Sequence, residues 1–434
     1  MPLTRDLGLA WSLARRAVRS RSSRRRLERD PRVAVTPAPG TVRVAVYFAD
    51  TAVNMYQIRQ WYAPLAHLAE TFPVAIVVRS PGTMVTMLDE SPVPLVYARK
   101  VADLEDFVAA QPLALTLYVN QNAKNFQMMR YGRMWHVFVN HGESDKMYMT
   151  TNQFKAYDYA FVAGDAAKDR LAAKLWDYDL EKRAVPIGRP QADHFSGEVP
   201  YPDDDRLVVL YAPTWEGDRP AAAYGSIATH GLALVRALLA SGRHRVVYRA
   251  HPRSGVLDPE YRRAHEAIIR ALGEANARDP DAHHVHDVGP ELGWQLAAAD
   301  VAVTDISAMV YDRLATGRPL VVTRPVAVEA DVDESGYLGD AEWLTADGAG
   351  DIVALVDRVV DDPEARGRLE HWVRRHFGDT SPGAATHRFE SAVARLVQLR
   401  DDYAARRPSI DDPRSTGSAG DADQEAGDAE ASDL

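Results

Sequence analysis

Residues 299–322, ADVAVTDISAMVYDRLATGRPLVV, constrain the fold more than any other stretch of the sequence. The apolar run Val301–Val303 predicts a buried parallel strand, and a helical pattern begins directly after the turn at Thr304–Ser307. Gly317 and Pro319 end that helix, and a second apolar run follows. Such a strand–turn–helix–strand unit places free backbone N–H groups at a helix N-terminus, where proteins hold phosphate. The pattern indicates an α/β enzyme that binds a nucleotide diphosphate at the carboxyl end of its sheet.

Length and composition limit the classes to which the chain can belong. Its 434 residues are too many for one ordinary domain, so we expect two. There is no cysteine, which excludes disulfides, thiolate nucleophiles and cysteine-based metal sites. No apolar run reaches the roughly 20 residues that span a bilayer, and arginines interrupt every N-terminal stretch that could form a signal peptide. The net charge of -10 argues against nucleic acid as a partner, and we expect a cytoplasmic protein.

A basic arm, residues 1–33, precedes the first strand-like run. Its partly amphipathic helical pattern includes Trp11 and is interleaved with arginines, among them Arg15, Arg16 and Arg19. A segment of this kind can lie in a lipid interface and attract anionic headgroups. The alternatives are a solvated arm or a helix packed on the protein's own acidic surface. We expect the arm to hold the protein peripherally at the anionic inner face of the cell membrane.

Alternating strand and helix patterns predict a first α/β domain over residues 34–190. The expected strands are Val42–Phe48, Val74–Val78, Leu113–Val119, Val137–Val139 and Tyr159–Val162, and the expected helices are Asn54–Glu70 and Ala166–Leu175. The stretch 191–205 is rich in turn residues and predicts an interdomain linker.

The same alternation predicts a second α/β domain over residues 206–400. The expected strands are Leu207–Ala212, Arg245–Arg249, Val285–His286 and Val301–Val303, and the expected helices are Leu232–Leu239, Gly350–Val360 and Glu364–Val397. Residues 408–434 are rich in Asp, Glu, Ala, Gly and Ser without periodicity, which is typical of a disordered acidic tail. The whole pattern predicts two Rossmann-like domains that face a cleft.

Four segments share one format, in which an apolar strand ends at a polar or histidine-bearing turn. They are VFVNHGESDK at 137–146, VVLYAPTW at 208–215, VVYRAHPR at 246–253 and VAVTDIS at 301–307. In open α/β sheets the ligand lies outside the carboxyl ends of the strands. Two such domains facing each other would therefore bind one substrate on each side of the cleft.

These motifs resemble those of the CDP-glycerol glycerophosphotransferases of teichoic acid synthesis, which are GT-B-like. They stand here as His141-Gly142-Glu143-Ser144, Tyr211-Ala212-Pro213-Thr214-Trp215, Arg249-Ala250-His251-Pro252 and Thr304-Asp305-Ile306-Ser307-Ala308. The resemblance covers about residues 130–395. It implies transfer of a glycerol-phosphate or related polyol-phosphate unit from a CDP-linked donor to a hydroxyl of a membrane-associated glycan or polymer, in cell-envelope polymer synthesis.

Two positions depart from the family pattern. Glu143 and Ser144 stand where Thr-Pro is usual, beside the expected acceptor site, and Ala308 replaces a second serine that could have bound phosphate.

His141 is the candidate catalytic residue of the first domain. It follows a strand and precedes a glycine, so its imidazole can project into the cleft and take a proton from a hydroxyl near neutral pH. The resemblance implies that it is the general base on the acceptor alcohol. The other acceptor-side candidates, some of which could orient its ring, are Asn140, Gly142, Glu143 and Asp145. The alternative is a histidine that only hydrogen-bonds a loop.

On the donor side, the resemblance implies that His251 contacts the diphosphate and stabilises the charge of the leaving nucleotide. Arg249 would add positive charge there. The alternative is that Arg249 and His251 pair with nearby acids. Ser307 can cap a helix or bind phosphate with the same helix end.

The remaining donor-side candidates are less specific. Asp305 would repel a diphosphate, so it either holds the loop or contacts a ribose hydroxyl. Asp312 is a second ribose candidate, although a solvated helix face explains it as well. Thr304, Pro213 and Thr214 complete the donor-side set.

The sequence gives no reason to expect a metal or a cofactor. His283, His284 and His286 lie close together, but nothing else completes a ligand set. Two rival functions stay open: a GT-B glycosyltransferase that uses a nucleotide sugar, and an inactive nucleotide-binding homologue that acts as a scaffold. The departure at Glu143 and Ser144 motivates the second rival.

Overall fold

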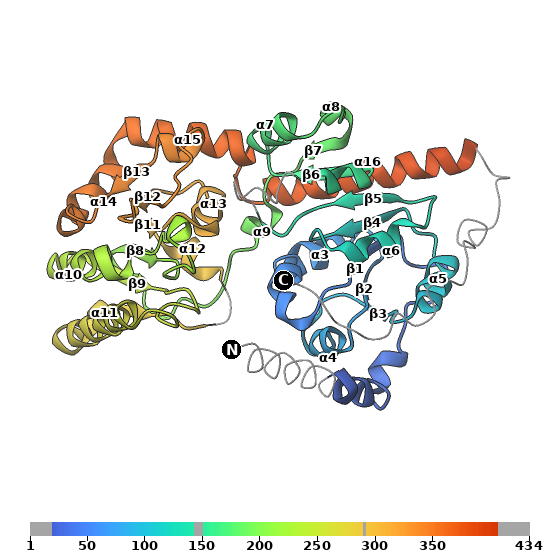
Figure 1. The fold of residues 1–434 in the computed structure, drawn as a ribbon, viewed down its shortest axis with the longest axis horizontal. Coiled ribbons are helices and arrows are strands. Elements are labelled where there is room, and N and C mark those ends of the chain that lie inside the picture. The colour runs from blue at the N-terminus through green and yellow to red at the C-terminus, as the bar shows by residue number, and fades with distance from the viewer. Residues whose placement is uncertain (1–19, 143–150, 290–291, 407–434) are drawn as a thin grey trace, which may run out of the picture.

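The computed structural model describes residues 20–142, 151–289 and 292–406, and within these ranges two parallel β-sheets form the frame of the molecule (Figure 1). The first sheet has seven strands in the order β3-β2-β1-β4-β5-β6-β7, and the second has six in the order β10-β9-β8-β11-β12-β13. Every pair of neighbouring strands is parallel. The predicted fold class, two Rossmann-like α/β domains, is confirmed.

The elements of the first domain alternate along the chain from β1 to α9. Its strands are β1 (Val44–Phe48), β2 (Val74–Val78), β3 (Leu95–Tyr97), β4 (Leu115–Tyr118), β5 (Trp135–Phe138), β6 (Tyr159–Val162) and β7 (Ala184–Pro186). Its helices are α2 (Met55–Arg59), α3 (Tyr62–Leu68), α4 (Pro81–Glu90), α5 (Val101–Ala110), α6 (Phe126–Met129), α7 (Asp165–Lys174), α8 (Leu180–Arg183) and α9 (Pro190–Asp193).

Strand β1 shows why the strands of this sheet are apolar without a break. All five of its residues are buried, because helices cover both faces of the sheet. Val44, Val46 and Phe48 face one core of the domain, whereas Ala45 and Tyr47 face the other. The period of two that governs any strand therefore divides one continuous apolar run between two cores.

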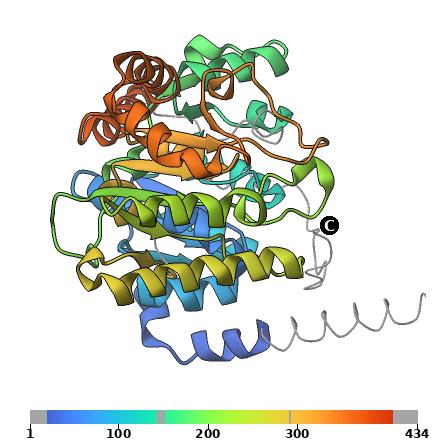
Figure 2. The same cartoon turned by 90° about the vertical axis from the view of Figure 1, so that its left-hand side faces the viewer.

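The second domain faces the viewer in Figure 2. Its strands are β8 (Leu207–Ala212), β9 (His244–Tyr248), β10 (Val285–His286), β11 (Val301–Thr304), β12 (Leu320–Thr323) and β13 (Glu342–Leu344). Its helices are α10 (Leu232–Ala240), α11 (Pro259–Arg278), α12 (Trp294–Ala298), α13 (Ala308–Leu314), α14 (Ile352–Asp361) and α15 (Pro363–Phe377). Helices α10, α11 and α14 contribute to the core on one face of the sheet, and α12, α13 and α15 to the core on the other.

Two segments predicted as single helices are each divided into two. The helix expected over Asn54–Glu70 breaks into α2 and α3, because Pro64 has no N–H to bond the carbonyl four residues before it. The helix expected over Glu364–Val397 is interrupted between α15 and α16 (Ala384–Arg406). Gly378 and Gly383 in that interruption have φ values of 69° and 80°, which glycine adopts without steric cost.

Helix α16 corrects the predicted extent of the second domain. Its apolar side chains, Phe389, Val393, Leu396 and Val397, belong to a core of the first domain, where the rings of Phe389 and Trp61 lie 5.2 Å apart. Figure 1 shows the helix, in red, running along the first domain. The prediction that residues 206–400 form one domain is therefore wrong at its end, because this amphipathic helix buries its apolar face on the first sheet.

The two domains also meet where α15 approaches α7. A side chain at Gly164 would place its Cβ only 2.5 Å from the carbonyl oxygen of His376. Asp169 and Arg375 form an ion pair across the same junction. The absence of a side chain at Gly164 is what lets the start of α7 reach the end of α15.

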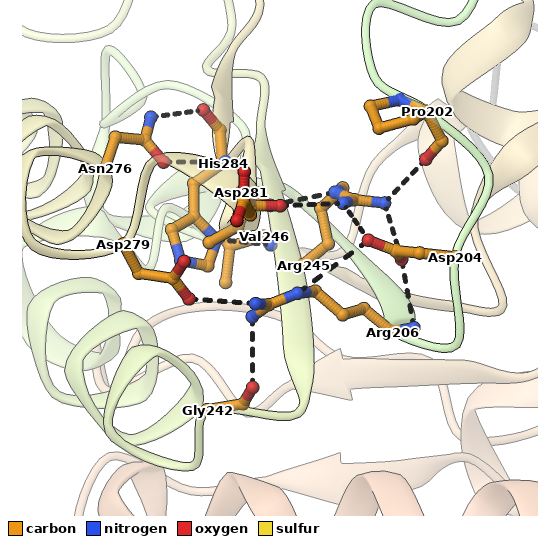
Figure 3. A network of polar contacts seen from close by, with 11 residues as sticks. Pro202, Asp204, Arg206, Gly242, Arg245, Val246, Asn276, Asp279, Asp281 and His284 are labelled. Atoms are coloured by element: carbon orange, nitrogen blue, oxygen red, sulfur yellow. Dashed lines mark hydrogen bonds and ion pairs between the residues drawn. The ribbon is translucent and has the colours of Figure 1, made fainter.

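The linker that follows α9 is fastened to the second domain by an arginine, as Figure 3 shows. The guanidinium of Arg245, which is buried, donates to Asp204 Oδ1 and Oδ2 over 3.0 and 2.6 Å. His284, one of the three clustered histidines, has a structural role beside this network. Its Nδ1 accepts the N–H of Val246 at 3.1 Å. In the part of the chain that the structure describes, no three side chains could together hold a metal ion.

The described part of the basic arm packs on the first domain. Residues 20–27 are helical, and Leu27 is buried in the same core as α16. Arg26 and Arg32 form ion pairs with Asp89 at the end of α4. Trp11, Arg15, Arg16, Arg19 and the predicted acidic tail at 408–434 lie outside the described residues. None of the described helices is both long and apolar enough to cross a bilayer.

Replacing Phe389 with alanine tests the role of α16. Removal of this buried ring should lower the free energy of unfolding of the first domain by about 3–5 kcal/mol. Urea denaturation followed by tryptophan fluorescence measures it, since Trp61 lies against the ring. Ser391→Ala, an exposed change on the same helix, is the control. Equal stability of both variants would contradict the packing of α16 on the first domain.

Candidate active site

The turn that follows β5 places His141 at the carboxyl end of the first sheet. Asn140 in this turn has a φ of 57°, in the left-handed region that few residues other than glycine adopt. Its Oδ1 accepts the N–H of His141 at 2.8 Å, and its carbonyl accepts the indole N–H of Trp61 at 2.5 Å. Its side-chain amide donates to the carbonyl of Gly142. These contacts fix the turn that carries His141.

A backbone carbonyl selects which nitrogen of His141 carries the proton. Nδ1 lies 3.0 Å from the oxygen of Val119, and because a carbonyl can only accept, Nδ1 is the donor. The lone pair of the neutral ring is then on Nε2. Burial lowers the pKa of His141, and the charge of Arg189 lowers it further, although the bond to Val119 opposes both. His141 is therefore a neutral proton acceptor at pH 7.

Asp305 connects the turns of the second domain. Its Oδ2 accepts the N–H of Thr214 at 2.7 Å and that of Ser226 at 3.1 Å, while its Oδ1 accepts the hydroxyl of Thr323 at 2.6 Å. The side chain is fully buried, and burial raises its pKa to about 6 despite these donors. Of the two roles considered for Asp305, these contacts favour holding the loops together over contacting a ribose.

His251 presents the opposite tautomer to His141. Its Nδ1 accepts the N–H of Arg253 at 3.1 Å, so in the neutral ring Nε2 carries the proton and can donate to an anion. Although the residue as a whole is exposed, desolvation of its ring and the charge of Arg253 lower the pKa of His251, which favours the neutral ring. The backbone N–H of His251 donates to the carbonyl of Pro213 at 3.2 Å, which joins the turns after β8 and β9.

Arg249 pairs with a nearby acid, which was the alternative to a phosphate contact in the sequence analysis. Its guanidinium forms an ion pair with Asp287, which also accepts a hydrogen bond of 2.5 Å from Gln295. Arg253 lies over the ring of Trp215, with its guanidinium carbon 3.7 Å from the ring centroid. Both cations of this motif are thus engaged by side chains of the second domain.

The remaining donor-side candidates lie on the same edge of the second sheet. Ser307 caps α13, because its Oγ accepts the N–H of Met309 at 3.2 Å. Thr304 is fully buried at the end of β11, and its hydroxyl has no hydrogen-bond partner among the described residues. Thr214 accepts the hydroxyl of Tyr261 at 2.7 Å through its carbonyl. Hydrogen bonds among these turns thus connect three of the four motifs predicted from the sequence.

Asp312 and a residue that the sequence analysis missed join the two domains. Asp312 on α13 is buried and forms an ion pair with Arg189, which follows β7 in the first domain. Its position on a buried helix face excludes the solvated face considered above. The available signal for Arg189 was its place between Gly188 and Pro190, two residues that favour turns, just before the predicted linker. Glu143 and Asp145 lie outside the described residues.

Comparison with known proteins places these motifs in a family. A model of the family described as CDP-Glycerol:Poly(glycerophosphate) glycerophosphotransferase matches residues 132–329, a range that contains all four strand-end motifs. Over this range the chain is similar to the glycerophosphotransferase family. No protein of curated function matches the sequence.

Solved structures share the fold of this chain. The wall teichoic acid polymerase TagF is similar with 13% identity and a TM-score of 0.52, over 83% of this chain and 90% of that one. A putative UDP-N-acetylglucosamine 2-epimerase from Listeria monocytogenes is similar with 14% identity and a TM-score of 0.52, over 86% and 99% of the two chains. At these identities the likeness shows the fold alone, which is GT-B-like.

The buried carboxyl of Asp305 predicts a specific dependence of stability on pH. Because its pKa is raised to about 6, the native state binds a proton more readily than the unfolded chain, and wild type loses stability as the pH rises from about 4 to 7. Asp305→Asn cannot ionise. The free energy of unfolding of Asp305→Asn minus that of wild type should therefore rise by up to about 3 kcal/mol between pH 4 and 7.

Urea denaturation of wild type and variant at several pH values measures this difference. The exposed Asp347→Asn is the control, and its stability relative to wild type should not follow the same curve. A constant difference between Asp305→Asn and wild type from pH 4 to 7 would contradict the raised pKa.

Proposed function

We propose that this protein transfers a glycerol-phosphate unit, or a related polyol phosphate, from a CDP-linked donor to a hydroxyl of a membrane-associated glycan or polymer in cell-envelope synthesis. The family match over residues 132–329 supports the donor and the reaction class. The observation that carries the mechanism is the pair of histidines with opposite tautomers. His141 presents a lone pair on Nε2, and His251 presents a proton on Nε2.

The proposed reaction is a displacement at the phosphorus atom that carries the polyol. The acceptor oxygen attacks this phosphorus while its proton passes to Nε2 of His141. The bond from the phosphorus to the oxygen that bridges the two phosphates breaks, and CMP leaves with that oxygen. His251 donates a hydrogen bond from Nε2 to the departing phosphate, where negative charge develops. A new phosphodiester and CMP are the products.

A GT-B glycosyltransferase that uses a nucleotide sugar is the nearest rival, because it would place a diphosphate at the same sheet edge. The two functions differ in the nucleotide released, CMP for the polyol donor and a nucleoside diphosphate for a typical nucleotide sugar. A scaffold that binds nucleotide without turnover is the second rival. Incubation of the purified protein with each donor and with lipid extract as acceptor distinguishes all three.

His141→Ala should abolish transfer and leave donor binding intact. Loss of a general base lowers kcat by about 100- to 10,000-fold. CMP release from CDP-glycerol measures turnover, and titration calorimetry measures binding of the donor. The exposed His387→Ala on α16 is the matched control and should be fully active. Unchanged turnover in His141→Ala would remove the base assignment, and release of UDP but never CMP would refute the proposed donor.

We further propose that the basic arm holds the protein at an anionic membrane surface, where its acceptor lies. In the described part of the arm Arg21, Arg25 and Arg29 are exposed and follow one another at four-residue intervals. Arg21 and Arg25 lie in the helix over residues 20–27, where this spacing brings side chains to one side, and Arg29 follows in the turn after it. Because Leu27 lies in the core of the first domain, deletion of the whole arm would also disturb the fold, so exposed charges are the better target.

Replacement of Arg21, Arg25 and Arg29 by glutamine should weaken binding to phosphatidylglycerol vesicles. At about 1 kcal/mol for each charge near the surface, the loss is on the order of 100-fold. Co-sedimentation with vesicles measures it, and phosphatidylcholine vesicles should bind neither form. Glutamine at Arg263, Arg270 and Arg278, three exposed arginines of α11, removes the same charge elsewhere. Equal losses in the two triple variants would contradict a specific role for the arm.

A further inference from the structure

Arg189 lies between the two halves of the candidate site. It follows β7 and precedes α9, in the segment where the chain leaves the first sheet. Only 7% of its surface is exposed. A buried cation is costly unless it is paired and fully hydrogen-bonded, so its position calls for a reason.

The guanidinium of Arg189 contacts elements of both domains. Its Nη2 forms the ion pair with Asp312 on α13 and donates to Gln60 Oε1 at 3.3 Å. Its Nη1 faces the turn of the proposed base, because a Cβ on Gly142 would lie 3.7 Å from that nitrogen. The charge thus lies between the turn that carries His141 and the helix that begins at the donor-side motif.

The hydrogen bonds of this pair are incomplete. Nε of Arg189 is buried and has no hydrogen-bond partner among the described residues, and Asp312 Oδ1 contacts the guanidinium without the geometry of a hydrogen bond. Arg189 also lines a small cavity of about 50 Å³ that opens to solvent. Asn140 and Gly142 line the same cavity. An unused donor on a buried cation, beside the proposed base, fits an anionic group of a substrate.

Two other cations near the site, among the residues that the structure describes, are already engaged. Arg249 is paired with Asp287, and Arg253 lies on the ring of Trp215. Phosphoryl transfer concentrates negative charge on the oxygens of the transferred group, which a positioned cation stabilises. Arg189 contacts α13 through Asp312 and faces the turn of His141, and these are the elements proposed to hold the donor and the acceptor.

We propose that Arg189 binds the phosphoryl group during its transfer, and that Asp312 is a positioning residue that holds the guanidinium in place before the substrate arrives. The proposal rests on the proposed function. It adds a phosphate-binding residue, contributed by the first domain, to a site whose other candidate phosphate contacts come from the second.

Three variants test this role by CMP release from CDP-glycerol. Arg189→Gln removes the charge and should lower kcat by about 100-fold or more. Arg189→Lys keeps the charge without the planar fork and should lose less. Asp312→Asn breaks the ion pair but keeps the cation, so its loss should be at least tenfold smaller than that of Arg189→Gln. Arg374→Gln, an exposed change on α15, is the control.

If the ion pair is purely structural, the activity losses of the variants should follow a different order. Loss of either partner would then damage the junction, and Arg189→Gln and Asp312→Asn would lose activity and thermal stability alike. That result, or turnover by Arg189→Gln within threefold of wild type, would overturn the proposal. If Arg189→Gln does not fold, the comparison of Arg189→Lys with Asp312→Asn decides. A structural pair, which lysine can still form, would make Asp312→Asn the more damaging change, whereas the proposal expects Arg189→Lys to lose more activity because it lacks the planar fork.

The pH dependence of the transfer rate distinguishes the two roles, because the loss of a purely structural contact would not shift it. Tyr56 and Arg189 are the ionisable groups that face His141 from other described elements; Glu143 and Asp145 lie outside the described residues. Without the positive charge the pKa of His141 rises, so the acid limb of the rate profile should move to higher pH in Arg189→Gln. In Asp312→Asn it should move to lower pH, because the anion that offsets Arg189 is gone.

Turnover by wild type shows whether a failed test refutes the role of Arg189 or the proposed function itself. If wild type releases no CMP from CDP-glycerol, the proposed function fails, and calorimetric binding of CDP-glycerol to wild type and Arg189→Gln still tests the phosphate contact. If wild type is active but the kcat values of the variants relative to wild type are not those expected, only the role of Arg189 is refuted.

Discussion

The donor half of this molecule depends on one buried carboxylate. Asp305 ends a central strand and accepts hydrogen bonds from Thr214, Ser226 and Thr323, which belong to three other segments of the second domain. A carboxylate with no access to water must satisfy its oxygens inside the protein, so these segments have little freedom to move apart. The turn at Thr214 also positions His251 through the carbonyl of Pro213. The geometry of the proposed nucleotide site is therefore fixed by the protein itself.

Backbone groups control the chemistry of both histidines. The carbonyl of Val119 directs the lone pair of His141 outward, and the N–H of Arg253 directs the proton of His251 outward. Neither histidine is oriented by an acidic side chain, whose negative charge would repel a phosphate. The proposed acceptor and donor sides thus obtain opposite hydrogen-bonding roles from the same type of side chain.

The sequence could predict the parts of this architecture that are local. Strands buried on both faces give continuous apolar runs, so Val74–Val78, Tyr159–Val162 and Leu207–Ala212 are predicted to the residue, and their turns locate the site. The placement of α16 could not be predicted, because an amphipathic pattern shows that a face is buried but not what covers it. For the same reason the residue types alone could not show that Asp305 points inward or that Arg189 meets Asp312.

The return of α16 to the first domain makes the second domain an insertion within the first. The chain crosses between the domains twice, after β7 and again between α15 and α16. During synthesis the first sheet is therefore complete long before the helix that covers Trp61 and its neighbours has been made. Until the whole second domain has left the ribosome, this apolar surface stays open, and the first domain is the one that needs protection from aggregation.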